Sequence, residues 1–143
     1  MIKFNIILLI LLSVSALSCK NSKDKTNTST YSVSEIDMEK GSQIYRAKCM
    51  NCHKINGEGL SPTFPPLANS DFLENKLDKA IQMVKYGSSE AIKVNGKKYK
   101  SYMPASGLND KDLQLVFNYI LNSWGNQYGT VDIETVKGIK EKR

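Results

Sequence analysis

Histidine is scarce in this chain, occurring once among 143 residues, and cysteine occurs only three times. These counts are too low for a zinc finger or a multi-histidine metal enzyme, and for a small fold stapled by several disulfides. Hydrophobic residues make up 41% and charged residues 24% of the chain, an ordinary globular mixture that excludes wholesale disorder. Because domains run to about 100–200 residues, the length indicates a single domain.

The N-terminal segment predicts export. Lys3 precedes an apolar run over residues 6–12, and small residues follow it, as in a secretory signal peptide. The run is too short for a transmembrane helix, which needs about 20 residues. Ala16-Leu17-Ser18-Cys19 resembles the lipobox of bacterial lipoproteins, whose cysteine is acylated after cleavage. We therefore expect residues 1–18 to be a lipoprotein-type signal peptide and Cys19 to be lipidated; an ordinary signal peptide beside a stray cysteine is the alternative.

The residues after Cys19 divide into a tether and a domain. Residues 20–33 are polar and cannot bury enough apolar surface to offset the entropy of ordering. We interpret residues 19–33 as a lipid-anchored flexible tether and 34–143 as a domain held on the periplasmic side of a membrane. The net charge of +6 would suit a nucleic-acid partner, but export and the lack of a nucleic-acid motif argue against one.

Residues 34–143 predict an all-α domain with one small hairpin. Apolar residues recur at helical spacing, and capping residues precede them. An Asn-Gly pair between alternating residues is the strongest short hairpin signal. The expected elements are a helix opening at Ser34, a loop over 54–70, helices over 71–86 and 110–124, a hairpin over 92–99, and a short helix after Asp132.

The chemistry lies in Cys49-Met50-Asn51-Cys52-His53, a Cys-x-x-Cys-His motif that typifies covalent haem attachment in c-type cytochromes. Two thiols three positions apart at the end of a helix can reach the two vinyl groups on one edge of a porphyrin. The adjacent histidine then lies under the iron as the proximal ligand. We predict thioether bonds from Cys49 and Cys52 to one haem c, with His53 on the iron.

Three other interpretations of this motif are weaker. A thioredoxin-like dithiol would require a preceding strand within a βα pattern, which the sequence lacks. Structural zinc sites have four ligands, and two cysteines with one histidine leave such a site incomplete. A chance match is disfavoured because the only histidine of the chain occupies the required position.

Methionine is the remaining soft ligand for the sixth position of the iron, since no second histidine exists. Met50 lies inside the motif and cannot reach the other face of the haem. Met83 falls on the apolar stripe of a helix, where methionine commonly fills the core. Met103 lies in a loop before the last long helix and is followed by a stiffening proline. We predict Met103 as the distal ligand, with Met83 or an open site as alternatives.

From about Glu39 onward, the chain resembles the class I c-type cytochromes, in particular the small domains associated with haem–copper oxidases and copper nitrite reductases. Gly41 and Tyr45 match the first helix of that family, with Tyr119 as the aromatic partner on the last helix. Residues 64–67 (Phe-Pro-Pro-Leu) match the loop that walls the haem, and residues 94–104 match the hairpin and ligand loop.

The resemblance implies a cytochrome c fold, with three to five helices around one covalent haem and a hairpin before the methionine loop. It implies that Leu67 contacts the haem. It also implies that the proximal histidine donates its second nitrogen to a backbone carbonyl in the following loop, for which Pro62 is the best candidate.

A haem with both axial positions filled exchanges electrons and binds no substrate at the metal. We therefore expect an electron carrier, monomeric and not an enzyme, that serves a respiratory redox protein such as an oxidase or reductase. An electron-entry subunit of a larger oxidoreductase is one alternative. A haem sensor or enzyme with an open sixth site is the other.

Overall fold

The computed structural model describes residues 33–141. The predicted signal peptide, Cys19 and all of the predicted tether except Val33 lie outside the described residues. Within residues 33–141, no helix has the length and apolar character needed to cross a membrane. The described elements are α1 (Glu35–Lys48), α2 (Met50–His53), α3 (Asp71–Asn75), α4 (Leu77–Tyr86), β1 (Ile92–Val94), β2 (Lys97–Tyr99), α5 (Asp110–Leu121) and α6 (Ile133–Gly138).

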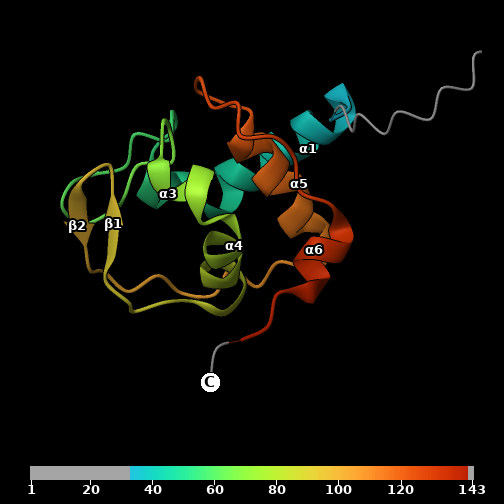
Figure 1. The fold of residues 1–143 in the computed structure, drawn as a ribbon. Coiled ribbons are helices and arrows are strands. Elements are labelled where there is room, and N and C mark those ends of the chain that lie inside the picture. The colour runs from blue at the N-terminus through green and yellow to red at the C-terminus, as the bar shows by residue number, and fades with distance from the viewer. Residues whose placement is uncertain (1–32, 142–143) are drawn as a thin grey trace, which may run out of the picture. The chain divides into compact units, whose positions relative to one another are not determined.

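The predicted fold class is confirmed: the described part is mostly helical and carries one two-stranded hairpin (Figure 1). The helices number six within residues 33–141, above the expected three to five. The difference comes from the single turn of α2 and from a break in the helix predicted over residues 71–86.

The first and last long helices, α1 and α5, cross in close contact. Ser34 caps α1 by accepting a hydrogen bond from the Asp37 amide, as predicted. A Cβ on Gly41 would meet the carbonyl oxygen of Leu115 and lie 2.7 Å from the Cβ of Tyr119. Only glycine therefore lets the two helices approach this closely, and this crossing fixes the end of α1, from which the Cys-x-x-Cys-His motif begins.

The helix predicted over 71–86 is two helices, α3 and α4, because the backbone leaves the helical conformation at Lys76, with φ −142° and ψ 43°. The side chain of Asn75 donates a 2.8 Å hydrogen bond to the Asp71 carbonyl oxygen. Asparagine side chains that bond to nearby backbone compete with the helical ladder in this way. The break therefore follows from a local side-chain bond that apolar periodicity does not reveal.

The last long helix, α5, ends at Leu121 and not at Trp124 as predicted. The Asn122 side chain donates to the Asn118 carbonyl oxygen at 2.9 Å, and the Ser123 hydroxyl donates to the Tyr119 carbonyl oxygen at 2.6 Å. These bonds take acceptors from the final turn of the helix. Trp124 then adopts a left-handed φ of 55°, which directs the chain away from the helix axis.

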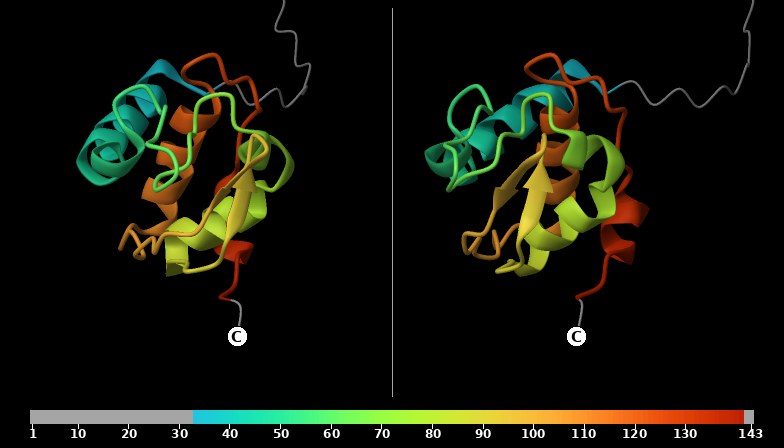
Figure 2. Two further views of the ribbon diagram at one scale, coloured as in Figure 1. Left: turned by 90° about the vertical axis from the view of Figure 1, so that its left-hand side faces the viewer. Right: turned by 60° about the vertical axis from the view of Figure 1, so that its left-hand side comes forward.

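The hairpin forms where the Asn-Gly pair predicted it. Its strands pair antiparallel, with Ile92 opposite Tyr99 and Val94 opposite Lys97. Asn95 and Gly96 both have positive φ, as the favoured two-residue hairpin turn requires. The hairpin lies next to α3, and in the left view of Figure 2 it faces the viewer. Val94 and Tyr99 are buried in the core that α1, α4 and α5 share.

Candidate functional site

The Cys-x-x-Cys-His motif forms a single helical turn at the end of α1. The amide of Cys49 still donates to the Tyr45 carbonyl oxygen at 2.8 Å, and the amide of His53 donates to the Cys49 carbonyl oxygen at 2.9 Å. Both thiols are free, with Cys49 half-buried and Cys52 exposed. Burial, and then the charge of Cys52, raise the pKa of the Cys49 thiol to about 11, so this thiol is protonated at neutral pH. One short turn thus presents two thiols and an imidazole together.

His53 is held in the form that a metal requires. The residue is 8% exposed, and its Nδ1 lies 2.9 Å from the carbonyl oxygen of Pro65. A carbonyl oxygen can only accept, so Nδ1 carries the proton and Nε2 keeps its lone pair. Burial lowers the pKa of the imidazole, while the hydrogen bond to Pro65 opposes that shift. A neutral ring with one nitrogen hydrogen-bonded to the protein is the usual arrangement of a metal-ligating histidine.

The carbonyl that orients His53 belongs to Pro65, so the prediction of Pro62 in this role is wrong. Residues 60–64 fold into a tight loop, because the amides and carbonyls of Leu60 and Phe64 bond reciprocally at 2.8 and 2.7 Å. Pro62 lies exposed at the tip of that loop. The chain then returns toward the motif and brings Pro65 to His53. The Phe-Pro-Pro-Leu segment was the sequence signal for this partner.

An apolar cavity lies beside the motif and consists of two adjoining hollows. Both hollows are lined by His53 and Met103, together with Pro65, Met83 and Ile92. Cys49 lines the inner hollow and Cys52 the outer one. Leu67 lines the inner hollow, in agreement with the haem contact that the family resemblance implies for it. Other wall residues of the inner hollow are Phe72, Leu73, Val84, Val94, Phe117 and Ile120, and those of the outer hollow include Phe64, Glu90, Tyr99, Ser101 and Tyr102.

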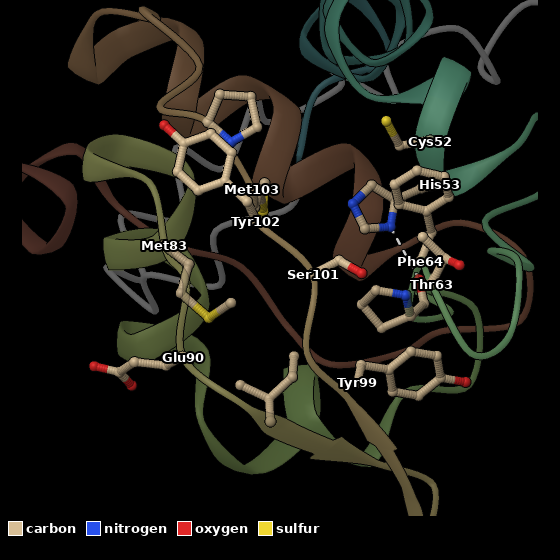
Figure 3. A pocket seen from close by; sticks show the side chains of 13 residues that line it. Cys52, His53, Thr63, Phe64, Met83, Glu90, Tyr99, Ser101, Tyr102 and Met103 are labelled. Atoms are coloured by element: carbon tan, nitrogen blue, oxygen red, sulfur yellow. Dashed lines mark hydrogen bonds between the residues drawn. The ribbon is translucent and has the colours of Figure 1, made fainter.

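Met103 lies across this cavity from His53 (Figure 3). Its backbone is fixed by an isolated antiparallel bridge to Ser88, just after α4. Met83, which the sequence suggested as core filling, also reaches the cavity from α4. The structure therefore brings together every predicted haem-site residue except Pro62, and it adds Pro65.

These residues fit a haem. A neutral imidazole offers one free nitrogen, thioether sulfur lies on the opposite side, and two thiols stand at the rim of the same apolar space. Among residues 33–141 no cluster of three or more histidine, cysteine or acidic side chains could hold a metal ion by itself. A helical domain with this arrangement is a c-type haem domain.

Comparison with known proteins agrees with this class. The family model for cytochrome c matches residues 38–124, and the chain belongs to the cytochrome c family. It is 36% identical over 105 residues to cytochrome c-552 of Thermus thermophilus, covering 70% of this chain and 75% of that protein. It is 35% identical over 92 residues to cytochrome c6 of Gracilaria tenuistipitata var. liui, covering 63% and 76%. The protein is accordingly a cytochrome c electron carrier, and its cofactor is covalently bound haem c.

Cytochrome subunits of enzymes are also similar to this chain. The gluconate 2-dehydrogenase cytochrome c subunit of Pantoea cypripedii is 34% identical over 94 residues, which cover 63% of this chain and 21% of that subunit. The fructose dehydrogenase cytochrome subunit of Gluconobacter japonicus is 25% identical over 109 residues, or 22% of its length. This chain therefore corresponds to about a fifth of each of these two subunits.

Proposed function

We propose that this cytochrome carries single electrons through a haem attached at Cys49 and Cys52 and ligated by His53 and Met103. The observation that supports it most is the neutral His53 ring, fixed by the Pro65 carbonyl, on one side of a cavity that Met103 lines from the other. A haem iron held by His53 on one side and by Met103 on the other would have no free position for a substrate. The protein then acts as a carrier and has no enzymatic activity of its own.

The haem supplies an iron that alternates between the ferric and ferrous states. The surrounding residues set how easily it does so. The Met103 thioether is a soft ligand that favours the reduced iron, as in other His/Met-ligated cytochromes. Apolar side chains such as Leu67 and Phe117 line the inner hollow and would pack against the haem. Pro65 holds the imidazole in one orientation, so little has to move when an electron arrives or leaves.

We further propose that the carrier is an exported, monomeric lipoprotein on the periplasmic side of a membrane. The signal-like segment, the Ala-Leu-Ser-Cys sequence at residues 16–19 and the polar stretch after it support this placement. Acylated Cys19 would anchor the chain, and residues 20–33 would let the domain reach a respiratory partner. A Cys19→Ala variant should then partition into the soluble fraction of the exported protein, whereas wild type stays with the membranes.

A second candidate is an electron-entry subunit of a larger oxidoreductase, which the similarity to dehydrogenase cytochrome subunits favours. The two roles differ in the size of the native particle. A free carrier extracted in mild detergent runs at the size of one chain. A subunit elutes together with a dehydrogenase at a larger size, and that result would favour the subunit of a complex over the free carrier.

Carbon monoxide tests the ligation. The reduced wild-type protein should bind carbon monoxide slowly, and the oxidised protein should show the weak long-wavelength absorption band of sulfur bonded to ferric haem iron. Met103→Ala should lose wild-type ligation, while Met38→Leu, a change on α1 outside the cavity lining, should retain it. Rapid carbon monoxide binding by the wild type at neutral pH would reject the carrier with two protein ligands in favour of a sensor or enzyme.

A further inference from the structure

Two methionines, Met83 and Met103, line the same cavity on the side facing His53 (Figure 3). Their thioethers are chemically identical ligands, so chemistry alone does not choose between them. Their supports differ, because Met83 is part of a regular helix, α4, whereas Met103 belongs to a loop. What holds the loop therefore decides which sulfur reaches the iron.

The Met103 loop is attached to the end of α4 by backbone hydrogen bonds. The Ser88 amide donates to the Met103 carbonyl oxygen, and the Met103 amide donates to the Ser88 carbonyl oxygen, both at 2.8 Å. Three residues further on, the Ser106 amide donates to the Val84 carbonyl oxygen at 2.9 Å. The loop is thus fixed at Met103 before Pro104 and at Ser106 after it, to Ser88 just beyond α4 and to Val84 within α4.

Gly87 makes this attachment possible. Its φ of 83° is in the left-handed region, and a Cβ at this position would lie 3.0 Å from the Ala105 nitrogen and 3.1 Å from the Met103 carbonyl oxygen. Any side chain there would push against the backbone of the methionine loop, which cannot rotate away. The glycine serves both to turn the chain out of α4 and to let the loop lie against that turn.

Resting on the proposed ligation, we propose that Gly87 and Ser88 form a clamp that selects Met103 over Met83 as the sulfur ligand. The clamp fixes the Met103 backbone relative to α4, so the Met103 sulfur can reach the iron without any further loss of conformational freedom in the loop. When the clamp is loosened, the Met103 loop moves away from α4. Met83 remains in the cavity, because α4 is fixed by the buried Ala80 and Ile81 and by the 2.7 Å ion pair of Lys85 with Asp110 on α5.

The experiment compares holoproteins carrying Gly87→Ala and Gly107→Ala. Gly107 is the matched control, because it has a similar φ of 69° in the loop beyond Met103 and no atom within 4 Å of its Cβ position. Gly107→Ala should match wild type in the sulfur-to-iron absorption band, the reduction potential and the rate of carbon monoxide binding. Gly87→Ala should keep a sulfur-to-iron band but shift its position and the reduction potential, because Met83 takes the place of Met103.

The double variant Gly87→Ala/Met83→Leu removes both the clamp and the second sulfur. Loss of two backbone hydrogen bonds shifts the release of Met103 about tenfold or more in both variants. Met83 can fill the vacated position only in Gly87→Ala, so the double variant should bind carbon monoxide about tenfold faster than Gly87→Ala alone. A double variant that binds no faster than Gly87→Ala would refute the competition between the sulfurs. Gly87→Ala indistinguishable from Gly107→Ala would refute the clamp.

Two measurements keep the proposal testable if Gly87→Ala does not fold. Amide hydrogen exchange of the wild-type holoprotein should show the Ser88 and Met103 amides protected, and exchange as fast as in an exposed strand residue such as Lys98 would overturn the clamp. Met103→Leu should bind carbon monoxide more slowly than Met103→Leu/Met83→Leu, and equal rates would overturn the role of Met83. Rapid binding by the wild type itself would instead reject the proposed ligation, so the two failures are distinguishable.

Discussion

Alanine should have opposite effects at two helical glycines, Gly41 in α1 and Gly138 in α6. Alanine is favoured over glycine inside a helix by about 1 kcal/mol, and overpacking a tight contact costs about 1–3 kcal/mol. At Gly138, the last residue of α6, no atom lies within 4 Å of the added Cβ, so alanine meets no obstacle there. At Gly41 the obstacles are the Leu115 carbonyl oxygen and the Tyr119 Cβ, neither of which can rotate away.

The crossing of α1 and α5 must therefore open in Gly41→Ala, which places the overpacking cost at the upper end, about 3 kcal/mol. Subtracting the gain of about 1 kcal/mol leaves an expected net loss of about 2 kcal/mol in the free energy of unfolding. The assay is urea unfolding of the holoprotein followed by far-UV circular dichroism. With a slope of about 1–3 kcal/mol per molar urea, the midpoint should fall by about 1 M. Gly138→Ala should leave the midpoint unchanged or raise it. Equal midpoints for wild type and Gly41→Ala would show that the crossing is not limited by contact at this glycine.

The same urea assay checks two buried polar groups. Asn126→Ala should lower the free energy of unfolding by about 2–4 kcal/mol, because three hydrogen bonds of the buried side chain are lost. The Asn126 amide donates to the carbonyl oxygens of Leu67 and Ile120 at 3.0 and 2.8 Å, and its Oδ1 accepts from the Asn69 amide at 2.7 Å. A change below about 1 kcal/mol would contradict this assignment. Tyr45→Phe should cost about 1 kcal/mol at neutral pH, because the Tyr45 hydroxyl donates to the Lys54 carbonyl oxygen at 2.6 Å. Burial raises the pKa of Tyr45 above its ordinary 10.0, so the hydroxyl of the unfolded chain loses its proton at a lower pH than that of the folded chain. The free energy of unfolding of the wild type therefore falls as pH rises above about 10. Tyr45→Phe has no such pH-dependent loss, so the stability difference between the two proteins should shrink between about pH 8 and about pH 11. A deficit that stays constant would argue against this tyrosine as the titrating group.

The elements that the sequence predicted well are those specified by neighbouring residues. Ser34 and Asn109 cap their helices as their residue types require, each accepting a hydrogen bond from the amide three positions on. The Asn-Gly pair at 95–96 sets the hairpin register, because two residues with positive φ are what the turn needs. The Cys-x-x-Cys-His turn is likewise specified by residues that are neighbours in the sequence. Gly41 and Tyr119 could be paired only through the family resemblance, since 78 positions separate them in the chain.

The predictions that failed depended on where a side chain or carbonyl points. Asn75, Asn122 and Ser123 could equally have faced solvent, and only the structure shows them bonded to helix carbonyls. Three prolines follow the motif, and the spacing does not reveal that the loop at 60–64 exposes Pro62 and returns Pro65 to His53. Each error has the same physical origin, which is competition between nearly equivalent hydrogen-bond partners.

The two sides of the haem cavity differ for the same reason. On the proximal side, the motif and Pro65 lie within 17 consecutive residues, so a short stretch of chain specifies the imidazole and its hydrogen bond. On the distal side, Met103 is 50 positions from His53, and its place depends on a backbone bridge to Ser88. Gly87 matters because it lacks a Cβ that would push against the Met103 loop, and no sequence pattern reveals such a role. The proposed distal ligand, Met103, is thus the part of the site that a substitution remote from the iron can most easily change. The proposed proximal ligand, His53, is the part that is hardest to displace.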